Sequence, residues 1–75
     1  MTLEQARDLL GWSQTKLAEK AGEKVSTVND IERGRNQRPS YVVVMHIVQA
    51  LQRGGLKGVK PEDIFPVPTQ VAKAS

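Results

Sequence analysis

The stretch of sequence that decides the fold runs from Ser13 to Gly34 and has the sequence SQTKLAEKAGEKVSTVNDIERG. Its pattern predicts two short amphipathic helices, because apolar residues recur at helical spacing on either side of Ala21-Gly22. Ser13 is a good N-cap for the first helix, and Trp12 and Leu17 stand at the two positions of a hydrophobic staple. A turn at Gly22 is expected to end this helix.

The second helix of this unit is predicted from about Val25 to Arg33, with Gly34 ending it. Val28 and Ile31 are its inward residues, three positions apart. Two helices at this spacing form a helix-turn-helix, whose second helix can enter the major groove of DNA.

The length and composition limit the rest of the chain. With 75 residues it has room for one small domain, predicted at residues 1–65, followed by a flexible tail at 66–75. There is no cysteine, so neither a disulfide nor a thiolate metal site is expected. No apolar run approaches the roughly 18–20 residues that span a bilayer. The N-terminus does not resemble a signal peptide, so we expect a cytoplasmic protein with no membrane partner.

The net charge of +3 permits nucleic-acid binding without establishing it. Its distribution is more informative, because Arg33, Arg35 and Arg38 fall within six residues, with Asn36 and Gln37 among them. In isolation such a run is a solvated basic loop. Directly after a helix that can enter the major groove, it lies where DNA phosphates would be.

Helical signals also surround the central unit. Thr2 and Gln5 match a capping box for a helix from Leu3 to about Leu10. We expect an apolar stripe on this helix, made of Leu3, Ala6, Leu9 and Leu10.

The segment after Pro39-Ser40 is ambiguous at its start. Residues 41–44 are rich in β-branched side chains and could form a strand. A helix to about Arg53 is favoured, because a core-facing stripe recurs at helical spacing: Tyr41, Val44, Ile47, Val48 and Leu51. Pro61 then suits the first position of a last short helix, and Ile64 and Phe65 would return to the core.

These residues together resemble the phage repressor and Cro family of helix-turn-helix proteins, the XRE-like regulators. The resemblance rests on Gly11-Trp12-Ser13-Gln14, Leu17-Ala18, Ala21-Gly22, Val28, Ile31-Glu32-Arg33-Gly34 and Arg38-Pro39-Ser40. It covers roughly residues 3 to 65 and implies an all-α, compact, lambda-repressor-like domain of five helices. It further implies double-stranded DNA as the partner and a homodimer on a palindromic operator.

The resemblance also suggests roles for single residues. It implies a partly buried salt bridge between Arg7 and Glu32. It also implies that Gln14 contacts a phosphate and lies against the second helix of the unit. The base-contacting residues are then expected on the second helix of the unit: Val25, Ser26, Asn29 and Asp30. The residues expected to contact phosphates are Gln14, Lys16, Lys24, Thr27, Arg33, Arg35, Asn36, Gln37 and Arg38.

Residue chemistry refines the expected base contacts. Asn29 could pair bidentately with adenine, and Val25 could pack on a thymine methyl group or be partly buried instead. Asp30 could accept a hydrogen bond from cytosine N4 or restrain Arg33. The chain departs from the family where Lys24 replaces a capping Ser or Thr, and where Glu23 and Asp30 add negative charge.

Three apolar residues of the 41–53 segment, Val42, Val43 and Met45, exceed what one core-facing stripe can bury. They are expected to form a dimer or partner interface, or else merely to line the following loop.

Three functions remain open at this point. The first is a sequence-specific regulator, a repressor or Cro-like switch protein that occupies an operator and excludes polymerase. The second is an antitoxin or protein-interaction module that binds a toxin or another regulatory protein. The third is a scaffold that has lost DNA binding. Catalysis, a metal and a cofactor are not expected, since His46 has no second histidine or cysteine to accompany it.

Overall fold

The computed structural model describes residues 1–36 and 39–65, and these form five helices and no strand. The helices are α1 (Leu3–Leu10), α2 (Gln14–Ala21), α3 (Val25–Glu32), α4 (Tyr41–Gly54) and α5 (Pro61–Ile64). The expected all-α class and five-helix architecture are confirmed. The expected flexible tail at 66–75 lies outside the described residues, as do Gln37 and Arg38.

Three of the helices, α1, α2 and α4, follow a residue whose side chain accepts a hydrogen bond from the backbone. Thr2 and Gln5 form the predicted capping box of α1, with bonds of 3.1 and 2.9 Å. Ser13 accepts from the Lys16 N–H at the start of α2, and Ser40 accepts from the Val43 N–H at the start of α4. Each of these bonds satisfies an amide that has no partner within its helix.

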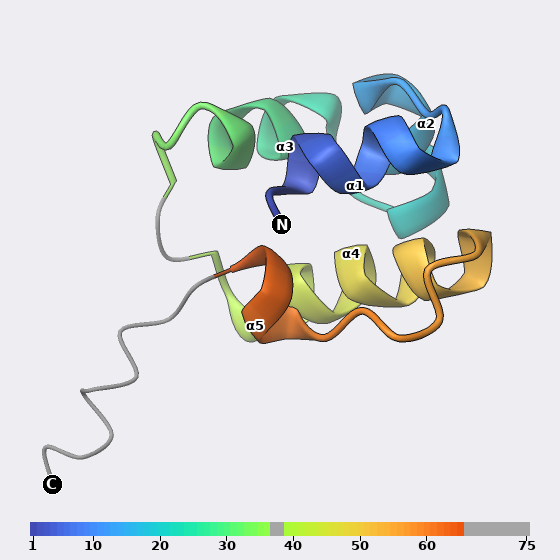
Figure 1. Cartoon of the computed structure of the whole chain (residues 1–75). Helices are drawn as coiled ribbons and strands as arrows, with labels where there is room; N and C mark the ends of the chain where they lie inside the picture. The colour runs from blue at the N-terminus through green and yellow to red at the C-terminus, as the bar shows by residue number, and fades with distance from the viewer. Residues whose placement is uncertain (37–38, 66–75) are drawn as a thin grey trace, which may run out of the picture.

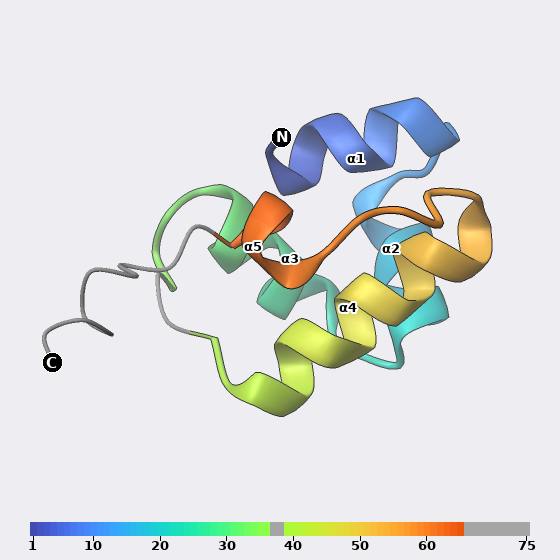
Figure 2. The same ribbon diagram turned by 60° about the horizontal axis from the view of Figure 1, so that its bottom comes forward.

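The helices surround one hydrophobic core. In Figure 1, α1, α2 and α3 lie together in the upper part of the molecule, and α4 runs below them. Figure 2 shows the loop from 55 to 60 running back along α4, so that α5 lies near the start of the chain. The largest fully buried side chains come from three different helices: Leu17, Val28, Ile47, Val48 and Leu51. The packing of α2 and α3 against α4 in this core holds the two helices in place.

Two expected core positions are wrong. Tyr41 is 76% exposed, because it opens α4 six residues before Ile47, the first buried residue of this helix. Leu9 is 65% exposed, because it lies beside the stripe of Leu3, Ala6 and Leu10 rather than on it. The segment 41–44 is helical, so the alternative of a strand is excluded.

Candidate nucleic-acid interface

The pair α2 and α3 forms the predicted helix-turn-helix. Gly22 ends α2 with a φ of 71°, in the left-handed region, and its N–H donates to Ala18 and Glu19 carbonyls. A glycine there avoids the strain that a side chain would bring. The buried Leu17, Ala18 and Ala21 of α2 and Val28 of α3 join the two helices to the core.

The opposite face of α3 is open to solvent. Val25 is 41% exposed, Ser26 is exposed, and Asn29 and Asp30 are half-buried. These four positions lie on one side of the helix, since they pair at a spacing of four residues. The four residues expected to contact bases are therefore brought together on one surface. We call it the α3 face.

Lys24 stands at the N-cap of α3 and gives it no side-chain cap. Its ammonium group can only donate, so it cannot accept from the free amides of the first turn. Thr27, half-buried in that turn, donates its backbone N–H to the Lys24 carbonyl at 3.0 Å. The start of α3 thus carries an exposed cation and no side-chain cap.

A partly buried ion pair supports this unit from α1. Arg7 Nε and Nη2 donate to the two Glu32 carboxylate oxygens at 2.7 and 3.0 Å, and Nη1 donates to the Trp12 carbonyl at 2.9 Å. The side chains of Arg7 and Glu32 are only 12% and 7% exposed. Burial alone would raise the pKa of Glu32. The hydrogen bonds from Arg7 and Gln14 and the charge of Arg7 outweigh burial, so this pKa lies below its ordinary value.

Gln14 extends this network to the α3 face. Its Nε2 donates to Glu32 Oε1 at 2.9 Å, and its Oε1 accepts from Asn29 Nδ2 at 3.2 Å. Asn29, considered from the sequence only for its contact with a base, therefore also has a partner within the protein. The family resemblance implies that Gln14 lies against the second helix of the unit, but nothing in the local sequence pattern identifies Asn29 as its partner.

Asp30 organises the loop that follows α3. Its carbonyl accepts from the N–H groups of Arg35 and Asn36 at 2.8 and 3.1 Å. Its carboxylate lies 3.7 Å from the Arg35 guanidinium, and the side chains of Arg35 and Asp30 are 66% and 44% exposed. The sequence suggested that Asp30 could restrain Arg33; in the structure the ion pair is made to Arg35 instead.

Positive charge flanks the α3 face. Four of the residues expected to contact phosphates are basic and exposed: Lys16, Lys24, Arg33 and Arg35. Glu23, which the sequence placed as an unfavourable acid near DNA, bonds to His46 Nδ1 at 2.7 Å. That contact joins the turn before α3 to the middle of α4, and sequence analysis missed it because the two residues are 23 positions apart.

The surplus apolar residues of α4 divide between two faces. Val43 is half-buried and packs against the core, because it lies on the side of α4 that faces the other helices. Val42 is 57% exposed, Met45 is half-buried, and Tyr41 is exposed beside them. The expected partner surface is therefore redrawn as Tyr41, Val42 and Met45, which we call the α4 patch.

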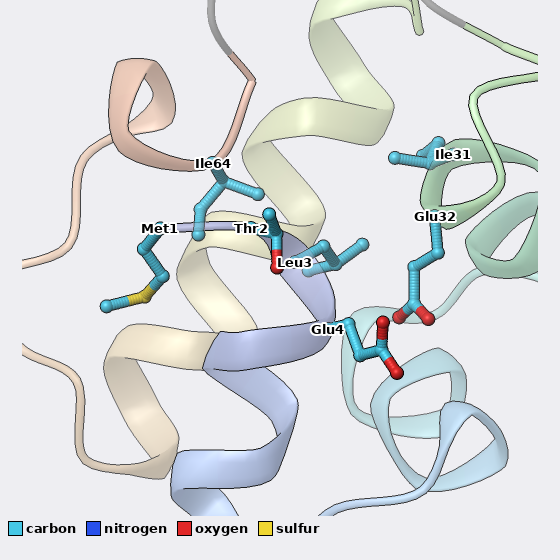
Figure 3. A pocket seen from close by; sticks show the side chains of 7 residues that line it. All are labelled: Met1, Thr2, Leu3, Glu4, Ile31, Glu32 and Ile64. Carbon is cyan, nitrogen blue, oxygen red and sulfur yellow. The ribbon is translucent and has the colours of Figure 1, made fainter.

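A small hollow lies away from the α3 face, between the start of α1, the end of α3 and α5. Figure 3 shows its lining, which includes Leu3, Glu4, Glu32 and Ile64. Its Glu32 carboxylate is already bonded to Arg7 and Gln14. The described residues bring together no group of three His, Cys, Asp or Glu side chains able to hold a metal ion. Among those same residues, no helix is both long and apolar enough to cross a membrane.

Comparison with known proteins gives one match. The model of a helix-turn-helix family matches residues 3–54, more than half of the chain, and this range contains α1 to α4 with the whole α3 face. No curated protein and no solved structure matches the chain.

Proposed function

Since the chain belongs to the XRE-type helix-turn-helix family of DNA-binding transcription regulators, we propose that it is a repressor or Cro-like switch protein. It binds a palindromic operator as a homodimer, with α3 in the major groove. Occupying the operator excludes polymerase. This family is one of DNA-binding regulators rather than of enzymes.

The observation that carries this proposal is the open α3 face with exposed cations around it. Val25, Ser26, Asn29 and Asp30 project from one side of a helix whose other side is fixed to the core. In the sequence, Lys16 and Lys24 precede α3, and Arg33 and Arg35 follow it. Cations at both ends of a reading helix can neutralise phosphates on either side of the groove.

The proposed base contacts follow from side-chain chemistry. Asn29 pairs with adenine, Val25 packs on a thymine methyl group, and Ser26 bonds to a base edge. Asp30 accepts from cytosine N4 when its carboxylate turns away from Arg35. The remaining proposed contacts, all to phosphates, come from Gln14, Lys16, Lys24, Thr27, Arg33, Arg35, Asn36, Gln37 and Arg38.

The dimer is proposed to form through the α4 patch. A two-fold axis between two chains would bury Tyr41, Val42 and Met45 on each of them. It would also set the two α3 helices about 34 Å apart, which is one turn of DNA.

The salt dependence of binding tests the proposal. The logarithm of affinity is expected to fall linearly with the logarithm of salt concentration, because each phosphate contact releases a counterion. Arg35→Ala should weaken binding to all duplexes and lower the slope by about 1, whereas Asn29→Ala should mainly relax sequence preference. An absence of DNA binding even at low salt would overturn the proposal.

A second function, an antitoxin or protein-interaction module on the same fold, is favoured by the exposed apolar α4 patch. A toxin or another regulatory protein would then cover the patch in place of a second copy. Co-expression with the product of a neighbouring gene, followed by measurement of the mass of the purified complex, separates the two. A wild-type chain that binds neither DNA nor a partner would instead be a scaffold.

A further inference from the structure

Asp30 and Arg35 are joined twice, once through the backbone and once through their side chains. The Asp30 carbonyl accepts from the N–H groups of Arg35 and Asn36 at 2.8 and 3.1 Å. These two bonds fix the loop to the end of α3 without using either side chain. The charged groups of Asp30 and Arg35 are thereby kept within reach of each other, and they lie 3.7 Å apart.

This ion pair can open while the backbone stays in place. Both side chains reach solvent, and a pair of this kind shifts an equilibrium by about fivefold at most. A DNA phosphate competes with Asp30 for the guanidinium, since arginine pairs with phosphate as it does with carboxylate. When Arg35 turns to a phosphate, the Asp30 carboxylate loses its cation. The net gain from the phosphate contact therefore depends on what the carboxylate meets next.

The base that faces Asp30 decides that gain. A carboxylate in an ion pair accepts hydrogen bonds and donates none. In the major groove adenine, guanine and thymine each present an acceptor atom, whereas cytosine presents only the donor N4. Cytosine is thus the one base that gives the carboxylate a hydrogen bond and places no acceptor against it.

We propose that Asp30 and Arg35 form an exchange pair, in which Arg35 makes its full phosphate contact only where Asp30 meets cytosine. On other base pairs Arg35 still reaches the phosphate, but the unpaired carboxylate cancels part of the gain. The inference rests on the proposed function, since it concerns how the α3 face reads DNA. It adds to that function a coupling between two contacts, through which a residue that bonds to a phosphate also determines sequence preference.

The experiment measures what Arg35 contributes on two different bases. A random duplex library, selected with the full-length wild-type chain, identifies the operator. The same selection with Asp30→Ala shows at which base pair a preference is lost. Operator duplexes are then made with cytosine or uracil at that position, because uracil replaces the N4 donor by the O4 acceptor and, unlike thymine, adds no methyl group. Affinities for both duplexes are measured for the wild-type chain, Arg35→Ala, Asp30→Asn and the double variant.

Arg35→Ala is expected to lower the affinity for the cytosine duplex by about tenfold and for the uracil duplex by about threefold or less. In the Asp30→Asn background the same change should cost an equal factor on both duplexes, because an amide leaves no unpaired charge. Arg33→Ala is the matched control, since Arg33 is an exposed cation of the same loop that makes no ion pair within the described residues. It should cost an equal factor on both duplexes in the wild-type background.

The outcomes separate this inference from the proposed function. A wild-type chain that enriches no sequence would overturn the proposed function and the exchange pair with it. A selective wild-type chain would overturn the exchange pair alone in two cases. In the first, Asp30→Ala loses no preference for cytosine. In the second, Arg35→Ala costs the same factor on both duplexes.

A second measurement needs no variant. For the wild-type chain, the slope of the logarithm of affinity against the logarithm of salt concentration should be steeper on the cytosine duplex by about half a unit or more. The reason is that a fuller Arg35 contact releases more of one counterion. Equal slopes on the two duplexes would overturn the exchange pair.

Discussion

At the scale of single residues, Asp30 is an acid on a surface proposed to meet phosphates. Its carboxylate lies 3.7 Å from the Arg35 guanidinium. The pair is exposed, so its contribution to folding is small, about 0–1 kcal/mol. Its effect on DNA binding is expected to be larger, because the same carboxylate both repels phosphates and holds a cation that would contact them.

Asp30→Asn is therefore expected to strengthen binding to non-specific duplex DNA by about three- to tenfold at low salt. The change keeps the size of the side chain, and the loop is retained because Arg35 and Asn36 bond to the backbone carbonyl of residue 30. Fluorescence anisotropy with a labelled random duplex measures the effect.

Glu62→Gln is the matched control, since it also adds one positive unit but lies exposed on α5, outside the helix-turn-helix. Equal gains from the two variants would show that net charge alone is responsible, and the role given to Asp30 would then be wrong.

At the scale of helices, local patterns predicted much of the fold. Thr2, Ser13 and Ser40 precede apolar periodic runs, and a cap acts within a few residues of itself, so the sequence contains the whole signal. The bond between Glu23 and His46 has no such signal, because it depends on where α4 packs. The same holds for the bond between Gln14 and Asn29, which depends on how α2 packs against α3.

Gly54 illustrates the difference at the end of α4. From the sequence it ends a helix, where glycine is common. In the structure a Cβ added to Gly54 would lie 2.6 Å from Trp12 Cζ2 and Cη2 and 3.1 Å from Leu10 Cδ1. The absence of a side chain thus lets the Trp12 ring pack directly on the last turn of α4.

Gly54→Ala is accordingly expected to destabilise the domain, although alanine favours helices over glycine by about 1 kcal/mol. Overpacking against a ring costs about 1–3 kcal/mol, so a net loss of about 1 kcal/mol is expected. In a domain of this size that lowers Tm by roughly 4–8 °C.

Thermal unfolding followed by circular dichroism measures this loss. Gly58→Ala is the control, since a Cβ there would meet nothing within 4 Å. A Gly54→Ala chain as stable as the wild type would mean that the Trp12 ring moves aside without cost.

At the scale of the whole molecule, α1 and α4 each support the α2–α3 pair with a side-chain contact. Arg7 of α1 bonds to Glu32 of α3, and His46 of α4 bonds to Glu23 in the turn between α2 and α3, so both contacts help to hold α3 in place. The start of α4 leaves Tyr41 and Val42 exposed and Met45 half-buried, so most of the α4 patch is open to solvent. One chain therefore presents one α3 face, whereas a palindrome offers two equivalent half-sites.

Val42→Glu tests whether the α4 patch joins two chains. In a single chain the new carboxylate would be tolerated, because Val42 is 57% exposed and lies in the first turn of α4, where negative charge is favourable. In a two-fold dimer the same change would bring two carboxylates into one apolar interface. Sedimentation equilibrium should give about twice the chain mass for the wild type and the chain mass for Val42→Glu.

Leu9→Glu is the matched control, since Leu9 is an apolar side chain of similar exposure on α1. It should leave the dimer intact. Loss of the dimer should also weaken binding to a palindromic duplex by more than binding to a single half-site, because only the palindrome engages two α3 helices at once. A Val42→Glu chain that keeps the doubled mass would exclude the α4 patch as the interface. A wild-type chain that is monomeric even on its operator would exclude the dimer itself.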